Sequence, residues 1–343
     1  MKIELPQLNQ LLFLILVFLL DLVRSQCPWH RDVPELQSSC ICAYNLGQEL
    51  SVQCDQVDFP KLLQALEDYA ASMTIDLLYV NNSSLSELKD GSFKKLTMHN
   101  VQLSGCGIRN IQPRAFRGQE RSLRNLNLQD NELTQVPIEA LRDLQSLSLL
   151  DLSRNRITKI PDGAFASLNL ATLKLSDNNV SLAPFAFRGL EDSLKNLNLK
   201  GTKQKRIPEA VRGLKTLAFL DMAQNALREL PGPAIGIMEG LHSLTALNLE
   251  RNLIQNVGPK AFSGVNDSLS SLSLLNNLIT EFPVAAMNTL VELRVSISTR
   301  STLIVLLKKS LSLVSVLKKI KKEKKNGEKI LNFGNTVVQK KNF

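Results

Sequence analysis

Leucine recurs along this chain at a fixed short spacing, and mostly polar residues fill the positions between. The segments LRNLNLQDNEL at 123, LSLLDLSRNRI at 147 and LATLKLSDNNV at 170 share the motif L-x-x-L-x-L-x-x-N-x-L. In the L-x-L part, successive side chains alternate between two faces, so Leu126 and Leu128 point inward and Asn127 points outward. The motif therefore predicts one short strand in each segment.

The same frame extends over most of the chain and defines nine successive units. The units begin at Ile75, Met98, Leu123, Leu147, Leu170, Leu194, Leu217, Leu244 and Leu269, with spacings of 23 to 27 residues. A period of this length indicates a solenoid whose strands lie side by side in a parallel sheet. Because each unit is covered only by its neighbours, a polar substitution at Leu152 should be severe. One at the outward Ser153 should be mild.

Two further columns recur, counted as offsets from the first residue of each unit. Offset 18 often holds phenylalanine, as in Phe93, Phe116, Phe165 and Phe262. Offset 8 holds asparagine, whose amide can both donate and accept hydrogen bonds where the backbone turns out of the sheet. We expect a structural role for this asparagine column, which comprises Asn131, Asn155, Asn178, Asn225, Asn252 and Asn277.

Two units depart from the asparagine column. The unit at Leu194 has Thr202 in the column and Gln204 in place of the next leucine, so its turn should be less well satisfied. The unit at Met98 has Cys106 in the column, between two glycines. A thiol is compact and makes weak hydrogen bonds, so we expect Cys106 to be a reduced, buried turn residue.

This motif, its period of about 24 residues and its phenylalanine resemble the extracellular leucine-rich repeat family over roughly residues 75–290. The resemblance implies an α/β solenoid: a right-handed horseshoe of strands and irregular helices with a parallel concave sheet and a disulfide-bonded N-terminal cap. The cap and composition also resemble insect cell-surface members of the family such as chaoptin and Artichoke, and more distantly Slit.

The first 25 residues have the layout of a secretory signal peptide. An apolar stretch at 11–23 lies between Lys2 and small polar residues at Ser25, and it is shorter than the ~20 residues of a spanning helix. An uncleaved membrane anchor is the alternative. We expect the mature chain to begin near Gln26 and to be extracellular, either secreted or held at the cell surface.

Four cysteines fall in residues 26–74, the predicted cap: Cys27, Cys40, Cys42 and Cys54. Secretion implies an oxidising compartment, which favours disulfides over metal ligands. Cys40 and Cys42 are too close in sequence to bridge comfortably, so each should bond outside that pair, which leaves two pairings open. The family resemblance implies Cys27 with Cys42 and Cys40 with Cys54.

Four asparagines lie in glycosylation sequons: Asn81, Asn82, Asn179 and Asn266. In a secreted chain these are candidates for N-linked glycans.

The repeat ends after Leu290, and residues 291–343 form a basic tail. This tail carries 11 Lys and 2 Arg against 3 Glu, a net charge of +10, so residues 1–290 carry −1 of the total +9. Lys308 and Lys309 interrupt the apolar run too early for a membrane span. Contact of a basic amphipathic helix with an anionic membrane, and a divergent, disordered or truncated end, are the interpretations left open.

The neutral body gives no electrostatic reason to bind nucleic acid, and no catalytic motif is present. The histidines His30, His99 and His242 are scattered, and no nucleophile and base can be assembled from the sequence. We therefore expect no enzyme, no cofactor and no metal site.

The outward strand residues predict a long, mixed-charge concave surface suited to an extracellular protein ligand or a cell-surface receptor. The candidate contacts are Arg124, Asn127, Gln129, Asp151, Arg154, Lys174, Asn198, Phe219, Asp221, Asn248, Glu250 and Arg251. A merely solvated face is the alternative. Cell adhesion, guidance or ligand recognition is the predicted function, and an innate-immune receptor ectodomain or a structural component of extracellular matrix are the alternatives.

Overall fold

The computed structural model describes residues 27–29, 32–230, 238–281 and 283–291, and the backbone of strands at 294–298, 303–306, 330–333 and 336–339. The chain divides into two compact units, each of which contains several of the repeats. The first covers residues up to Glu132 together with 139–147, and the second covers 133–138 together with residues from Ser148 onward. The predicted signal peptide and His30 lie outside the described residues.

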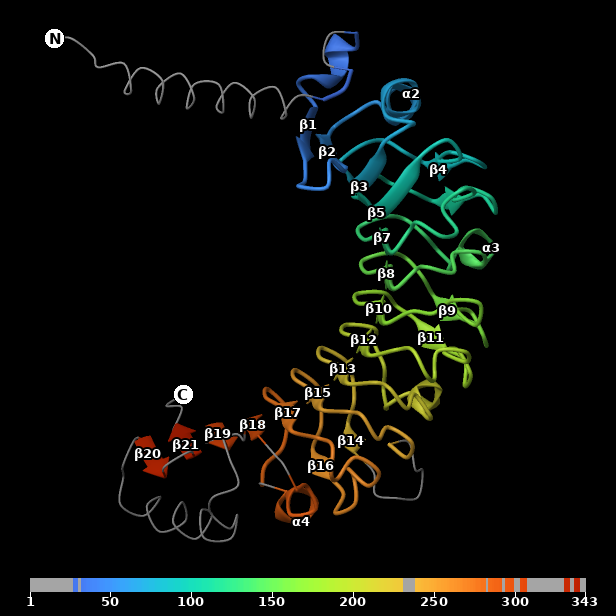
Figure 1. Cartoon of the computed structure of the whole chain (residues 1–343). Coiled ribbons are helices and arrows are strands. Elements are labelled where there is room, and N and C mark those ends of the chain that lie inside the picture. The colour runs from blue at the N-terminus through green and yellow to red at the C-terminus, as the bar shows by residue number, and fades with distance from the viewer. Residues whose placement is uncertain are drawn as a thin grey trace, which may run out of the picture. The chain divides into compact units, whose positions relative to one another are not determined.

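The first unit is a sheet that opens with an antiparallel hairpin and continues in parallel (Figure 1). In sheet order its strands are β1 (Cys40–Tyr44), β2 (Leu50–Asp55), β3 (Thr74–Asn81), β5 (Thr97–Ser104) and β7 (Asn125–Asn127). On the return side of the repeats, β4 (Glu87–Leu88) pairs with β6 (Asn110–Ile111). Its helical elements are a 3-10 turn (Pro34–Leu36) and α2 (Phe59–Tyr69), and the short α3 (Ile138–Leu141) begins at the junction with the second unit.

The cap is fixed by two disulfides and one capped helix. Cys27 bonds Cys42 and Cys40 bonds Cys54, which is the pairing that the family resemblance implies. Helix α2 begins after Asp58, whose side chain accepts a hydrogen bond from the Lys61 amide, and it buries an apolar face that includes Phe59. The cap therefore covers the first repeat strand with an ordered, cross-linked layer.

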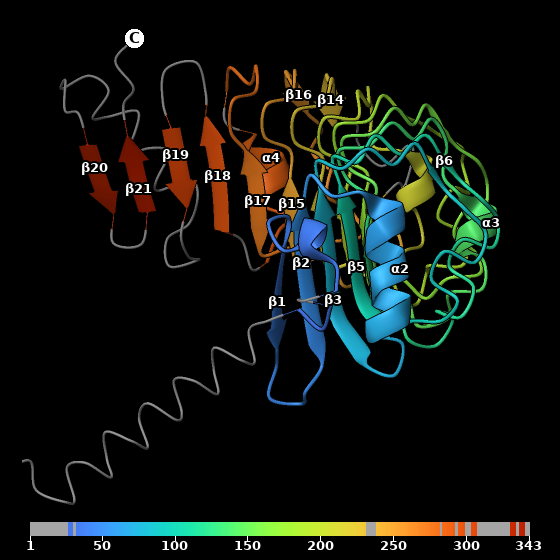
Figure 2. The same ribbon diagram turned by 90° about the horizontal axis from the view of Figure 1, so that it is seen from above.

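The second unit contains a parallel sheet that ends in antiparallel strands. In sheet order these are β8 (Leu149–Asp151), β10 (Thr172–Lys174), β12 (Asn196–Asn198), β13 (Phe219–Asp221), β15 (Ala246–Asn248), β17 (Ser271–Leu274), β18 (Arg294–Ser298), β19 (Leu303–Leu306), β21 (Thr336–Gln339) and β20 (Ile330–Phe333). Figure 2 shows β17, β18 and β19 side by side, with β17 and β18 parallel and β18 and β19 antiparallel. The remaining elements are β9 (Lys159–Ile160) with β11 (Ser181–Leu182), β14 (Glu229–Leu230) with β16 (Asn256–Val257), a 3-10 turn (Glu209–Val211) and α4 (Val284–Met287).

The strand register confirms the repeat frame. Central leucines align across neighbouring strands of the second unit, as in Leu173 with Leu150 and with Leu197. These side chains are fully buried, and burying a leucine contributes about 1.5 to 3 kcal/mol. Phenylalanines form a second contact line: the rings of Phe93 and Phe116 stack with centroids 5.8 Å apart. The core is thus a sum of identical contacts between successive repeats.

The asparagine column has the structural role predicted for it. The Asn252 amide nitrogen donates to the carbonyl oxygens of Met222 at 2.9 Å and Leu249 at 3.1 Å, and its Oδ1 accepts from the Leu227 amide at 3.1 Å. One side chain therefore satisfies backbone groups in two successive repeats. Equivalent bonds are made by Asn131, Asn178, Asn225 and Asn277.

The repeat at Leu194 makes part of these hydrogen bonds with different side chains, and the expectation of a less well satisfied turn stays a prediction. The Thr202 hydroxyl donates to the Leu199 carbonyl at 2.7 Å, and the Gln204 amide nitrogen donates to the Val180 carbonyl at 2.8 Å. Gln204 thus bonds to the preceding repeat, at a different carbonyl from the one that a column asparagine would contact.

Cys106 is free and buried, as predicted. Its side chain is 1% exposed, and the thiol donates weakly to the carbonyl oxygens of Ser104 and Val80. Burial raises the pKa of the Cys106 thiol, which keeps it protonated and unreactive.

Ser153 differs from the expectation of a solvated position. It is 1% exposed, because the chain turns immediately after it at Arg154, whose φ is +51°. The interpretation that substitution at Ser153 would be mild is therefore wrong for any larger side chain.

Candidate binding face of the repeat sheet

The predicted contact residues divide between the two units, and the strand frame sets their positions. In the first unit, Arg124 directly precedes β7 and is exposed, whereas Asn127, which ends β7, and Gln129, two residues later, are half-buried. In the second unit, the strand register places Asp151, Lys174, Asn198, Asp221 and Asn248 opposite one another on successive strands. The candidates of the second unit therefore form a row across successive strands, whereas those of the first unit lie at one strand.

Five polar residues at offset 4, which we call the strand-end column, also hydrogen bond to the backbone. Each side-chain oxygen accepts a hydrogen bond from the amide two residues later, at 2.9 to 3.1 Å. The column comprises Asn127, Asp151, Asn198, Asp221 and Asn248. Sequence reasoning missed this role, although five short polar residues at one offset carry the signal, because Asn and Asp favour such local turns. These oxygens are partly committed and offer a partner only their remaining capacity.

A column of left-handed residues follows at offset 7, and sequence reasoning missed it as well. Its φ values lie between +48° and +66° at Asn82, Gly105, Asp130, Arg154, Asp177, Gly201, Gln224, Arg251 and Asn276. The frequent Asn, Asp and Gly at this offset are the signal, since these residues tolerate the left-handed region best. The candidates Arg154 and Arg251 lie at this turn and are exposed at the strand ends.

Asp151 does not face solvent, and its prediction as a direct contact is corrected. Its side chain is 3% exposed, and its Oδ2 lies 3.2 Å from the Lys174 ammonium. Lys174 comes from the next strand and covers the carboxylate while its own side chain stays 41% exposed. A partner on this face would therefore meet Lys174, with Asp151 beneath it holding the ammonium in place.

Asp221 and Phe219 form the centre of the face in the second unit. Burial raises the pKa of the Asp221 carboxyl, opposed by the Ala223 amide and by Lys200. Phe219 lies two residues earlier on the same strand, between Asn196 and Ala246 on the neighbouring strands, and is half-buried. The smaller neighbours leave part of the aromatic ring accessible.

Glu250 and Arg251 follow the next strand, β15, and form a surface ion pair. The Arg251 Nε lies 3.4 Å from the Glu250 Oε1, which also accepts from the Asn276 amide at 3.2 Å. The face therefore offers a lysine, an aromatic ring, a carboxylate and an arginine from strands of separate repeats. This set can hydrogen bond, pair charges and bury an apolar surface with another protein.

A comparison with known families bears on this repeat architecture. The family model "Leucine rich repeat" matches residues 121–180 and 240–295. Over 113 residues the chain is 34% identical to chaoptin of Drosophila melanogaster, a match that covers 33% of this chain and 8% of chaoptin. These matches support an extracellular-type leucine-rich repeat family for the chain. The predicted resemblance to chaoptin is confirmed, and those to Artichoke and Slit stay predictions.

This leucine-rich repeat chain spans under a tenth of the curated relatives it matches first. A second is the human "Leucine-rich repeats and immunoglobulin-like domains protein 1", 37% identical over 100 residues, which are 29% of this chain and 9% of the relative. Among solved structures, the chain is similar to a TLR13–ssRNA13 complex, with a TM-score of 0.58, 24% identity and coverage of 72% of this chain and 35% of that chain. It is also similar to an octameric complex of Latrophilin 3, Unc5D and FLRT2, with a TM-score of 0.55, 23% identity and coverage of 71% of each chain. These likenesses show the fold, a parallel-sheet solenoid.

The sequons of the leucine-rich repeat chain have unequal surroundings. Asn179 is exposed, whereas Asn266 is half-buried and its amide nitrogen donates to the Thr289 carbonyl at 3.1 Å. Asn81 and Asn82 both donate to the Asp55 carboxylate, at 3.2 and 3.0 Å. Asn82 and Asn179 are the exposed members of the four. Glycosylation stays a prediction at all four positions.

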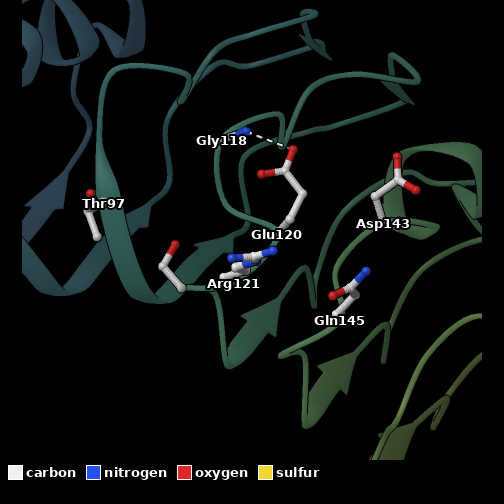
Figure 3. A pocket seen from close by; sticks show the side chains of 7 residues that line it. Thr97, Gly118, Glu120, Arg121, Asp143 and Gln145 are labelled. Atoms are coloured by element: carbon white, nitrogen blue, oxygen red, sulfur yellow. Dashed lines mark hydrogen bonds between the residues drawn. The ribbon is translucent and has the colours of Figure 1, made fainter.

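One open polar cleft lies outside the candidate face (Figure 3). It belongs to the first unit and is lined by Thr97, Gly118, Glu120, Arg121, Ser122, Asp143 and Gln145. The Glu120 carboxylate is committed to the turn, since it accepts from the Gly118 amide at 3.0 Å. Such a shallow polar cleft lacks the apolar enclosure typical of small-molecule sites.

Among the described residues, no helix combines the length and apolar character that crossing a membrane requires.

Proposed function

We propose that this leucine-rich repeat protein binds an extracellular protein ligand or a cell-surface receptor through the face of its repeat sheet, in cell adhesion, guidance or ligand recognition. The observation that carries the proposal is the set of side chains in the second unit that the core does not use. Lys174, Phe219, Glu250 and Arg251 extend from the strand segments and remain accessible. In this proposal the protein is a binding module and not an enzyme.

The chemistry of these side chains supports a protein partner. Aromatic and arginine side chains are enriched among the residues that carry most of the binding energy in protein interfaces. Lysine, glutamate and arginine around Phe219 can set orientation and association rate by charge complementarity. The two disulfides of the cap support an oxidising, extracellular setting.

The experiment compares two double variants of the full chain in binding to partners captured from extracellular and cell-surface extracts. Phe219→Ala with Arg251→Ala removes the aromatic ring and the arginine from the face. We expect the affinity for the captured partner to fall at least about tenfold, because a lost interface anchor costs more than about 1.4 kcal/mol.

The matched control removes one aromatic and one basic side chain elsewhere in the same unit. Phe185 is 54% exposed and Lys159 is exposed, and both lie outside the strands of the candidate face. Phe185→Ala with Lys159→Ala should leave binding unchanged. If the two double variants bind equally well, the sheet face is not the binding surface.

An innate-immune receptor ectodomain is the second candidate. The observation that favours it is a match to Toll-like receptor 7 of Drosophila melanogaster, 28% identical over 167 residues, which are 42% of this chain and 11% of the relative. Binding of the full chain to purified microbial glycans or lipids, with no host protein captured, would select this function over adhesion.

A further inference from the structure

Three side chains with metal-binding chemistry converge on the first unit. The His99 Nδ1 lies 3.7 Å from Oε1 of Glu49 and 3.9 Å from Oδ1 of Asp76. One ligand atom from each residue lies within 4.8 Å of the other two. No other group of three such residues occurs in the part of the chain that the structure describes.

The sheet brings these residues together from distant parts of the sequence. Glu49 directly precedes β2, Asp76 is the third residue of β3, and His99 lies in β5. The strands β2, β3 and β5 pair in parallel, and the register shifts next to Leu50, so that Asp76 has no partner on β2. The three side chains are partly buried, and that of His99 is 17% exposed. The strand pairing holds the backbones of the three residues in place, so side-chain rotations alone can bring their ligand atoms closer together.

We propose that Glu49, Asp76 and His99 bind a divalent zinc-type cation. An imidazole nitrogen with two carboxylates is a ligand set that zinc accepts, whereas calcium and magnesium prefer oxygen ligands alone. Two carboxylates and a neutral imidazole also balance the charge of the ion. The proposal is independent of the sheet face of the second unit, because none of its residues belongs to that face.

Neighbouring asparagines hold the two carboxylates. The Asn45 amide nitrogen donates to Oε2 of Glu49 at 2.7 Å, which leaves Oε1 directed toward His99. The Asn100 amide nitrogen donates to the Asp76 carbonyl at 2.6 Å and to its Oδ1 at 3.3 Å. Such outer hydrogen bonds orient metal ligands and tune their affinity.

The spacing fits a tetrahedral ion with one position open. Zinc binds these atoms at about 2.0 to 2.2 Å, which places ligand atoms about 3.4 Å apart. The two distances from His99 already approach that value, so small rotations of the carboxylates complete three coordinate bonds. Because the cluster is partly exposed, water or an acceptor from another protein fills the fourth position. The sequence alone predicted no metal site, since the residues are 23 and 27 positions apart and match no short ligand motif.

The test is zinc titration of the full chain, without a polyhistidine tag and after chelator treatment, by isothermal calorimetry. We expect one zinc equivalent to bind and excess calcium not to displace it. His99→Ala and Glu49→Gln should each weaken zinc binding at least tenfold, while His242→Ala, which removes an exposed histidine of the second unit, should bind zinc as the unaltered chain does.

Circular dichroism in the presence of chelator establishes that each variant is folded, and Glu49→Gln serves as the decisive variant if His99→Ala does not fold. The proposal is overturned if the unaltered chain shows no saturable zinc binding, or if folded His99→Ala or Glu49→Gln binds zinc with unchanged affinity.

Discussion

Each residue of the strand-end column forms a hydrogen bond to the backbone, and two of them in the second unit also carry a charge. Its side-chain oxygen must accept the amide two residues later, which Asn and Asp do equally well. Only Asp adds a charge, and the two aspartates of this column in the second unit have different surroundings. Asp151 lies against the Lys174 ammonium, whereas burial of Asp221 raises the pKa of its carboxyl. The asparagines at Asn198 and Asn248 show that the turn does not require the charge.

Asp221→Asn should therefore stabilise the protein at neutral pH. A raised pKa in the folded state means that ionised Asp221 is less favourable there than in the unfolded chain. The resulting decrease in the free energy of unfolding is absent below the unfolded-state pKa of about 3.9, and it grows as the pH rises through the folded-state pKa. The variant keeps the hydrogen bond from the Ala223 amide, and it has no carboxylate whose burial would destabilise the folded state. Thermal melting from pH 3 to pH 7 should show a gap in melting temperature that opens with pH.

A matched control is Asp192→Asn, because the Asp192 side chain is 80% exposed. It should leave the melting profile parallel to that of the unaltered chain. Parallel profiles for Asp221→Asn as well would show that burial of its charge is not a cost to folding.

The limits of sequence reasoning are clearest at these residues. The inward leucines follow from alternation alone, because burial of one strand face depends only on the residue's own position. The burial of Asp151 depends on Lys174, 23 residues away, and that of Ser153 depends on the turn at Arg154. The convergence of Glu49, Asp76 and His99 likewise depends on strand register, which the repeat frame did not supply for the cap.

The turns that close each repeat bring the backbones of successive repeats close together. At Gly189, φ is +93°, and an added Cβ would lie 2.7 Å from the Ala166 Cα and 2.9 Å from its carbonyl oxygen. At Gly213, the equivalent position of the next unit, φ is +82° and an added Cβ would meet nothing within 4 Å. Alanine substitution at both glycines therefore distinguishes the cost of the left-handed backbone, which the two positions share, from the cost of a steric clash, which only Gly189 would add.

Gly189→Ala should destabilise the protein more than Gly213→Ala. Both changes place a Cβ in the left-handed region, at a cost of about 1 to 2 kcal/mol. Only Gly189→Ala adds a clash with the backbone of the preceding repeat. Urea unfolding followed by circular dichroism should give a lower midpoint for Gly189→Ala. Equal midpoints would mean that the repeats move apart without cost at this turn.

For the whole molecule, one number read from the sequence, the repeat period, predicts most of the fold. The period fixes the strand positions, the register between neighbours and the inward columns, since each repeat contacts only the next. The division into two compact units was not predicted.

The net charge of the molecule is also unevenly placed, since residues 291–343 carry +10 and the remainder carries −1. We expect the full chain to bind vesicles that contain anionic lipid and not neutral vesicles, because each lysine near such a surface contributes about 1 kcal/mol. Replacing Lys318, Lys319, Lys321 and Lys322 with Gln should weaken that binding more than tenfold, measured by vesicle sedimentation at low salt.

The control replaces four exposed lysines of the second unit with Gln: Lys159, Lys195, Lys203 and Lys260. Both variants have the same net charge, +5, since each loses four lysines from a total of +9. If the clustered charge of the tail causes adsorption, only the tail variant detaches. If total charge is the cause, the two variants detach equally and the tail has no separate role. Binding to a protein partner through Phe219 and Arg251 should survive the tail variant, because that contact uses the repeat sheet.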